Sequence, residues 1–195
     1  LVVDTQEAMG ANILNTMLEA LKERLEELTG GQSLMAILSN YATEALVTAS
    51  CEIDFHSLSQ DKAEAECTAQ RIALASQFAK QDPYRASTHN KGIFNGIDAV
   101  LLATGNDWRA IEAGAHAYAA RDGRYQGLSN WEANLEERKL YGQLTLPMPV
   151  AAKGGSIGLN PMVVASFDLL GQPTSKELAS IIASVGLAQN FAALR

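Results

Sequence analysis

The chain has 195 residues, of which 47% are hydrophobic and 19% are charged. This length and composition suit one globular domain, or a large part of a bigger one, with a substantial apolar core. The formal net charge of −7 and the sequence pI of about 5.0 argue against binding to nucleic acids or acidic membranes, because no basic surplus neutralises phosphates.

The cysteines and the chain ends indicate where the protein works and how much of it is present. Cys51 and Cys67 are too few for a disulfide scaffold and lack metal-ligand spacing, so we expect reduced thiols in a cytoplasmic protein. No apolar run reaches membrane-spanning length, and no charged-then-apolar leader is present. Leu1 opens an apolar triplet typical of the middle of a strand, and Arg195 follows a helical pattern without a stop signal, which predicts a fragment.

The first long element predicted is an amphipathic helix that ends at Gly30 and Gly31. Residues 33–40 are short and apolar, and they fit a helix or a strand. Residues 45–55 have the β-branched content and partial alternation of a strand. The apolar face of the first helix consists of Ile13, Leu14, Met17, Leu18, Leu21, Leu25 and Leu28.

Five further helices are expected, with a break at residues 81–83 after the first of them. The last one opens with a capping box, in which Thr174 precedes Glu177 by three residues. The five helices lie at about residues 61–80, 92–103, 107–121, 161–170 and 174–195.

Between the third and fourth of these helices, residues 128–150 are poor in helix signals. Residues 140–150 predict a strand that ends at Pro147 and Pro149, and residues 153–158 predict a flexible loop. The chain is therefore predicted to be α+β, a helix-rich domain carried on a small sheet.

A first candidate site lies where the initial strand fragment gives way to a helix, at Met9, Gly10, Ala11 and Asn12. Small residues let the backbone approach a ligand, and the free N–H groups of a helix N-terminus favour an anion such as pyrophosphate. The usual dinucleotide fingerprint is absent. On these residues alone, a tight helix-capping turn explains the pattern better than a nucleotide site.

A second candidate site gathers polar groups at the start of the predicted helix at 92–103. Two cations, an imidazole and two amides have the chemistry to bind carboxylates and to polarise a carbonyl group. A solvated loop in which Asn90 caps the helix explains the same residues equally well. The cluster comprises Arg85, His89, Asn90, Lys91 and Asn95.

Asp107 follows Lys91 by sixteen residues, at the head of the next predicted helix. Two antiparallel helices joined by residues 104–106 do not automatically bring their starts together. The spacing therefore leaves Asp107 undecided between a partner of Lys91 and an N-cap of its own helix.

Other prominent residues receive simpler interpretations. His116 is expected to be a packed structural histidine in an Ala-rich helix, and His56 a loop residue. His89 is close to Lys91 in the sequence and is a candidate to orient this lysine without itself contacting a ligand. Trp108 and Trp131 are expected to anchor the core.

The run THNKGIFNGIDAVLLATGNDWRA, residues 88–110, resembles the active-site segment of the class II (bacterial) 3-hydroxy-3-methylglutaryl-CoA (HMG-CoA) reductases. The similarity extends to residues 4–16, 82–86, 153–161 and 185–194. It implies an NAD(P)H-dependent oxidoreductase of the mevalonate pathway of isoprenoid biosynthesis. This enzyme uses NADH or NADPH to reduce HMG-CoA in two steps to mevalonate and coenzyme A, without a metal ion.

The resemblance also implies residue roles. Lys91 matches the catalytic lysine that holds the carbonyl oxygen, and Asp107 the catalytic aspartate beside it; a buried pair would keep the lysine charged. Arg85 and Asn95 match residues that grip the hydroxymethylglutaryl group. The other implied contacts are Met9, Gly10, Ala11 and Asn12 with the dinucleotide, Asn40 near the nicotinamide, and Gln189 near CoA.

For the architecture, the resemblance implies that residues 1–39 finish an inserted small NAD(P)-binding α+β domain and that residues 40–195 belong to the large substrate-binding domain. It also implies a homodimer with shared active sites. The family's proton-donating glutamate and its flap-domain histidine would lie outside these 195 residues. Two alternatives are an enzyme that oxidises mevalonate and a non-catalytic CoA- or nucleotide-binding fragment; retention of Lys91 and Asp107 argues against the second.

Overall fold

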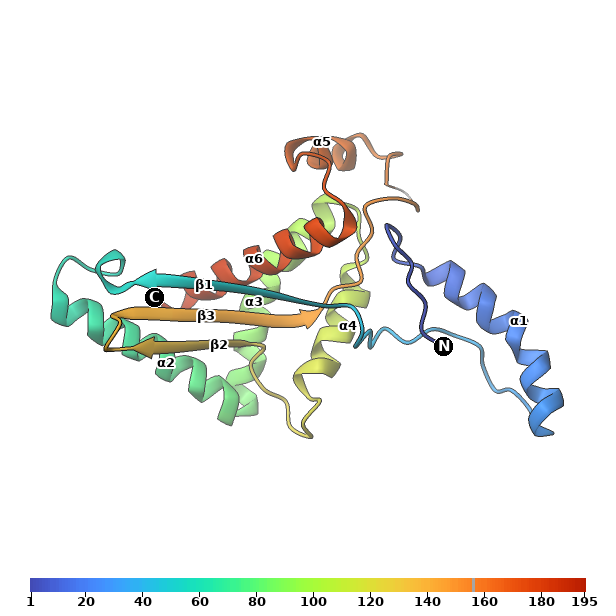
Figure 1. Ribbon diagram of the computed structural model, residues 1–195, viewed down its shortest axis with the longest axis horizontal. Helices are drawn as coiled ribbons and strands as arrows, with labels where there is room; N and C mark the ends of the chain where they lie inside the picture. Colours follow the sequence, from blue (N-terminus) through green and yellow to red (C-terminus); the bar gives the residue numbers. More distant parts are fainter. Residues whose placement is uncertain (156) are drawn as a thin grey trace.

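The computed structural model describes residues 1–155 and 157–195. A three-stranded antiparallel sheet runs through the body of the molecule, in the strand order β1-β3-β2. The strands are β1 (Leu46–Asp54), β2 (Ser129–Asn134) and β3 (Lys139–Pro147). Figure 1 shows this sheet crossed by longer helices, so the predicted helix-rich α+β class is confirmed.

In the part of the chain that the structure describes, six α-helices and one short 3₁₀ helix, η1, accompany the sheet. Helices α2 and α6 pack on the sheet, α3 packs against these two helices, and α4 and α5 lie at the end where β3 finishes (Figure 1). Their bounds are α1 (Ala11–Thr29), η1 (Phe55–Ser57), α2 (Lys62–Gln81), α3 (Pro83–Ala103), α4 (Trp108–Ala119), α5 (Pro161–Leu169) and α6 (Ser175–Leu194).

The core lies between the sheet and these helices. Strand β3 alternates, so that Leu140, Leu144 and Leu146 point inward and are fully buried. On the same face, Gly142 pairs with Trp131 across the strands, and a Cβ on Gly142 would lie 2.3 Å from the indole ring. Trp131 is 2% exposed, which confirms its predicted place in the core.

The junction of α2 and α3 differs from the sequence prediction. Pro83 was expected to open a loop, but it is the first residue of α3, and Asp82 is the N-cap that accepts hydrogen bonds from the N–H groups of Tyr84 and Arg85. The expected loop of polar residues is therefore helical. Asn90, expected as a helix cap, is fully buried within α3 and bonds to the backbone of Gln126 and Leu128.

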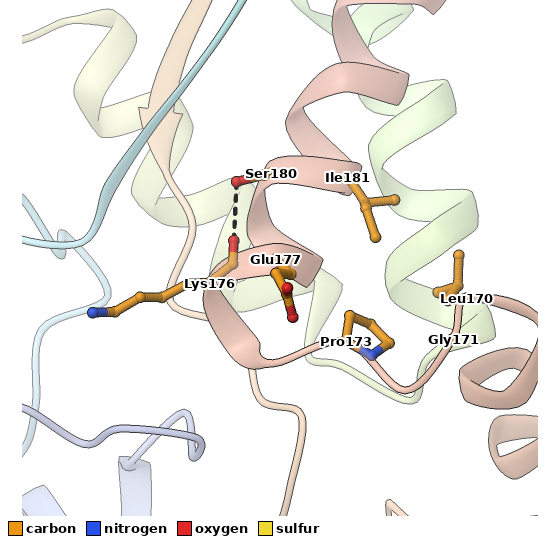
Figure 2. Close-up of a pocket in the computed structure, with 7 residues that line it drawn as sticks. All are labelled: Leu170, Gly171, Pro173, Lys176, Glu177, Ser180 and Ile181. Atoms are coloured by element: carbon orange, nitrogen blue, oxygen red, sulfur yellow. Dashed lines mark hydrogen bonds between the residues drawn. The ribbon is translucent and has the colours of Figure 1, made fainter.

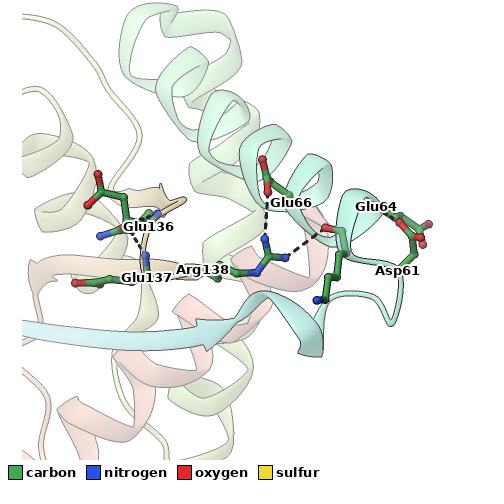
Figure 3. Close-up of polar contacts among 8 residues, drawn as sticks. Asp61, Glu64, Glu66, Glu136, Glu137 and Arg138 are labelled. Atoms are coloured by element: carbon green, nitrogen blue, oxygen red, sulfur yellow. Dashed lines mark hydrogen bonds and ion pairs between the residues drawn. The ribbon is translucent and has the colours of Figure 1, made fainter.

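Strand β2 was not predicted, because its sequence, SNWEAN, is short and polar. The hairpin between β2 and β3 is tied to α2 by Arg138, which donates to the Glu66 carboxylate at 3.2 Å and to the Lys62 carbonyl oxygen at 3.4 Å (Figure 3). The guanidinium also lies 5.5 Å from the centre of the Phe55 ring. These contacts tie the hairpin end of the sheet to α2 and η1.

The N-terminal part of the chain stands apart from this body (Figure 1). The predicted amphipathic helix is confirmed as α1. The structure describes every residue of α1, and none of them is buried. The strand expected at residues 1–3 is wrong, and residues 33–40 form neither helix nor strand. Residue 156 of the predicted loop at 153–158 lies outside the described residues.

Helix α6 is the longest apolar helix of the body. Thr174 caps it through the predicted capping box with Glu177. Among the described residues it alone has the length and composition of a membrane span. Its residues Leu178, Ile182 and Leu187 are buried against the sheet and α3, as in a core helix of a folded domain.

Candidate functional site

The turn that leads into α1 is closed by Thr5 and Gly10. Thr5 Oγ1 donates a hydrogen bond of 2.7 Å to the carbonyl oxygen of Ala8. Gly10 has φ +88°, and a Cβ at this position would lie 2.1 Å from Thr5 Cγ2, so only glycine fits. No side chain caps α1 and no acidic residue lies in its first turn. Within residues 1–155 and 157–195, no partner is present for the N–H groups at Met9–Asn12, which can receive an anion.

Asp107 lies on the same side of the body as this turn. Its carboxylate caps α4 by accepting the N–H of Ala110 at 3.1 Å, and it is 3.7 Å from Arg109 Nε. The preceding residue, Asn106, exchanges two hydrogen bonds with the backbone of Ala151, at 2.7 and 3.1 Å. The next residue, Ala152, donates to the backbone of the turn before α1, so Asp107 and residues 9–12 share one region.

A second group of predicted site residues lies on α3 and α6. Lys91 and Asn95 are exposed and four residues apart, so they occupy one face of α3. Gln189 of α6 packs against Gly96, its Cβ 3.0 Å from where a Cβ on Gly96 would be, but Gly96 lies about 140° around α3 from Lys91. Arg85 lies about 120° around α3 from Lys91 and is half-buried. The structure thus places Lys91 and Asn95 on one exposed face of α3, with Arg85 and Gln189 on other sides of the helix.

The two groups are well separated within one chain. Lys91 lies twelve residues before the end of α3 at Ala103, which corresponds to about 18 Å of helix, and Asp107 follows that end. No ion pair joins Lys91 to Asp107 within residues 1–155 and 157–195. The expected buried pair is therefore not formed inside a single chain.

Asn40 packs against α4, the helix that Asp107 caps. Its carbonyl oxygen would be 2.4 Å from a Cβ on Gly114, so the absence of a side chain at Gly114 lets residue 40 pack against α4. Gly114 is seven residues beyond Asp107, or about 10 Å along the helix. Asn40 is exposed, which leaves its side chain open to a ligand.

A buried polar network that sequence reasoning missed lies on the opposite side of α3 from Lys91. His89 Nε2 is 2.6 Å from Ser129 Oγ, and Ser129 Oγ and Trp131 Nε1 both donate to Asn190 Oδ1. Burial, and then the nearby charge of Arg85, lower the pKa of His89 to about 4. His89 is thus a neutral group inside the core, joining α3 to β2 and α6.

Asp98 is a second residue that sequence reasoning missed, although it lies seven residues after Lys91 and on the same face of α3. Burial, and then the charge and hydrogen bond of Glu112 on α4, raise the pKa of Asp98 to about 6. The two carboxyl groups lie close together between α3 and α4. Acidic residues at such spacing are usually solvated, and only the helix packing distinguishes this pair.

Asp98 gives a pH prediction. Because its pKa rises from 3.8 to about 6 on folding, the folded protein holds this proton more tightly than the unfolded chain, and stability falls as pH rises from about 4 to 6. We expect Asp98→Asn to raise Tm at pH 7 by about 1–3 °C and to lose this advantage below pH 4. Thermal melts of the full-length protein across this range test it; an equal gain at pH 3.5 and pH 7 would contradict it.

Three other expectations are settled by packing. His116 is a packed structural histidine as predicted, 2.8 Å from the Tyr125 hydroxyl through Nδ1 and beside the ring of Phe94. Trp108 is 37% exposed, so its predicted core role is wrong. His56 lies in η1 rather than in a loop.

A surface hollow lies where the connection from α5 meets α6, and Figure 2 shows its lining. It contains none of the predicted site residues. The lining residues are Leu170, Gly171, Pro173, Lys176, Glu177, Ser180 and Ile181.

Comparison with known proteins shows which protein family this chain is similar to. The family model of hydroxymethylglutaryl-coenzyme A reductase matches residues 1–195. The chain is 46% identical over 195 residues to the 3-hydroxy-3-methylglutaryl-coenzyme A reductase of Archaeoglobus fulgidus, covering 100% of this chain and 43% of that protein. It is 39% identical over 193 residues to a probable reductase of Borreliella burgdorferi, covering 99% and 44%. The chain thus spans less than half of these curated relatives.

Solved structures agree. A 3-hydroxy-3-methylglutaryl-coenzyme A reductase from Streptococcus pneumoniae is 73% identical with a TM-score of 0.96, over 98% of this chain and 45% of that chain. A class II reductase from the same organism, bound to NADPH in open conformations, gives the same identity and TM-score over 98% and 46%.

The fold and the matched sequences define a domain of a reductase family. The chain belongs to the hydroxymethylglutaryl-coenzyme A reductase family, and its structural neighbours are of the bacterial class II, which confirms the resemblance of the run at 88–110.

Proposed function

We propose that the full-length protein containing this chain is an HMG-CoA reductase that converts HMG-CoA to mevalonate and CoA with NADPH or NADH. The observation that carries the proposal is the exposed face of α3 that presents Lys91 and Asn95 together, four residues apart. The NADPH bound to a structural neighbour supports NADPH in particular. We also place the enzyme in the cytoplasm, in keeping with the absence of a basic membrane-binding surplus.

In this proposal Lys91 is the group that polarises the carbonyl group of the substrate. Its ammonium group binds the thioester oxygen, offsets the negative charge that develops there, and does the same for the mevaldehyde oxygen in the second step. Asp107, beside the lysine, controls the protonation of the groups in the site. Arg85 and Asn95 bind the carboxylate and hydroxyl end of the substrate, and Gln189 contacts CoA.

The nicotinamide cofactor supplies the two hydrides that the four-electron reduction requires. The free N–H groups of the turn at Met9, Gly10, Ala11 and Asn12 fit a pyrophosphate, since no side chain caps α1 and no Cβ fits at Gly10. Asn40 is assigned to the nicotinamide end. We propose accordingly that residues 1–39 belong to a small NAD(P)-binding domain and residues 40–195 to the large substrate domain.

We further propose a homodimer in which each active site takes residues from both copies. The separation of about 18 Å along α3 supports this, because Lys91 cannot reach Asp107 of its own chain. In a symmetric dimer, Lys91 of one copy can meet Asp107 of the other twice, once at each site.

Mixing two inactive variants tests this arrangement. Lys91→Ala and Asp107→Asn proteins, unfolded together and refolded, are expected to regain about a quarter of wild-type activity, because half of the dimers are mixed and each mixed dimer has one intact site. Each variant refolded alone is the control. Activity that stays at the level of the single variants contradicts shared sites.

The reaction itself is tested by following NADPH and NADH oxidation with HMG-CoA on the full-length protein. We expect two equivalents of cofactor to be consumed, and one CoA thiol released, for each HMG-CoA. Absence of HMG-CoA-dependent oxidation with either cofactor overturns the proposal.

A further inference from the structure

Glu7, three residues before Gly10, fastens the turn before α1 to the body of the molecule. Its carboxylate oxygen Oε2 accepts the backbone N–H of Ser175 at 2.9 Å. Its backbone carbonyl oxygen accepts the N–H groups of Ala152 at 2.9 Å and Lys153 at 3.1 Å. One residue of the turn therefore binds two segments that are remote from it in sequence.

The carboxylate of Glu7 meets a donor that the helix cannot satisfy itself. Ser175 is the first residue of α6, so its N–H has no partner within the helix. The capping box uses the side chains of Thr174 and Glu177 (Glu177 lies in the first turn of α6, seen in Figure 2), which leaves the Ser175 N–H to Glu7. A negative charge is also favoured at this end of a helix.

A second contact strengthens the same junction. Ser175 Oγ donates to the carbonyl oxygen of Gln6 at 3.0 Å, and Ser175 is only 7% exposed. The turn is thus held at both the side chain and the backbone of its neighbouring residues 6 and 7.

Little else positions the turn. None of the residues of α1 is buried, and Figure 1 shows this helix apart from the body. The chain returns to the body only at residues 40–45, where Asn40 packs on Gly114 and the carbonyl oxygen of Ala45 accepts the N–H of Met148 at 2.8 Å.

We propose that Glu7 is a positioning residue for the cofactor: its bonds to the start of α6 and to residues 152–153 hold the N–H groups of residues 9–12 in place. This inference rests on the proposed function of that turn. Glu7 itself touches neither substrate nor cofactor and acts through the backbone that follows it.

The test compares Glu7→Ala and Glu7→Gln with wild type in the full-length protein. We expect Glu7→Ala to raise KM for NADPH about tenfold, the effect of losing a charged hydrogen bond. KM for HMG-CoA and kcat should change by less than about twofold, and Glu7→Gln, which keeps an acceptor oxygen, should show a smaller rise. Asp4→Asn is the matched control, because the Asp4 carboxylate lies in the same turn but bonds only to Gln6.

An unchanged KM for NADPH in Glu7→Ala overturns the proposal, and so does an equal rise in both KM values with a lowered Tm. Amide hydrogen exchange separates this outcome from a failure of the proposed function. If wild type does not oxidise NADPH, the reductase assignment falls. Exchange in Glu7→Ala then still decides the role of Glu7: faster exchange at residues 8–14, 152–153 and 175 with α3 unchanged supports it, and wild-type exchange there overturns it.

Discussion

Lys91→Ala is expected to abolish reduction of both HMG-CoA and mevaldehyde, lowering kcat by at least about a thousandfold. The lysine ammonium is the group that we assign to the charge that develops on the carbonyl oxygen in both steps. Lys91 is exposed on α3, so its removal leaves the core untouched and the fold intact. Steady-state assays with each of the two substrates measure the effect.

The fold and the CoA site provide the controls for this variant. Binding of CoA should stay within about threefold of wild type, since Gln189 lies on α6 and does not depend on the lysine charge. Lys62→Ala, at an exposed lysine in the first turn of α2, is a matched surface variant that should keep full activity. Substantial thioester reduction by Lys91→Ala would refute the assigned role.

Asp107→Asn is expected to lower turnover by about a hundredfold or more while the protein stays folded. The structure makes this substitution informative, because the Asp107 side chain also caps α4 through the N–H of Ala110. Asparagine caps a helix about as well as aspartate, so the substitution removes the charge and keeps the cap.

Asp107→Ala separates the two roles of this residue. It should lower stability by about 1 kcal/mol through the lost cap and be no more active than Asp107→Asn. Turnover and Tm measured on both variants give the comparison. Near wild-type rates for Asp107→Asn would reduce Asp107 to a helix cap.

Periodicity and capping predicted much of the fold. The amphipathic pattern of α1, the capping box at Thr174 and the alternation of β1 are local signals, and each was sufficient for its element. The prediction at Pro83 was wrong, because a proline can end one helix or begin the next. Only the Asp82 cap shows that Pro83 begins α3. Strand β2 carries no local signal, since β3 pairing and the packing of Trp131 create it.

The site shows a similar division. The residue types around Lys91 indicated carbonyl chemistry, and the resemblance supplied their roles, but the partner of Lys91 depended on a distance. Once residues 83–103 are one helix, the rise per residue places Lys91 about 18 Å from the end of α3, which Asp107 follows. Asp98 and Glu112, and the network of His89, depend on contacts between elements remote in sequence, which no local pattern encodes.

Helix α6 touches both groups of site residues in one chain. Ser175 at its start is bonded to Glu7 beside the turn, and Gln189, about 21 Å further along, packs on α3 next to Asn95. A buried helix is stiff along its axis, so a displacement of one end is transmitted to the other end. Thermodynamic linkage then sets a reciprocal rule: whatever factor a bound dinucleotide applies to the affinity for HMG-CoA, HMG-CoA must apply to the affinity for the dinucleotide.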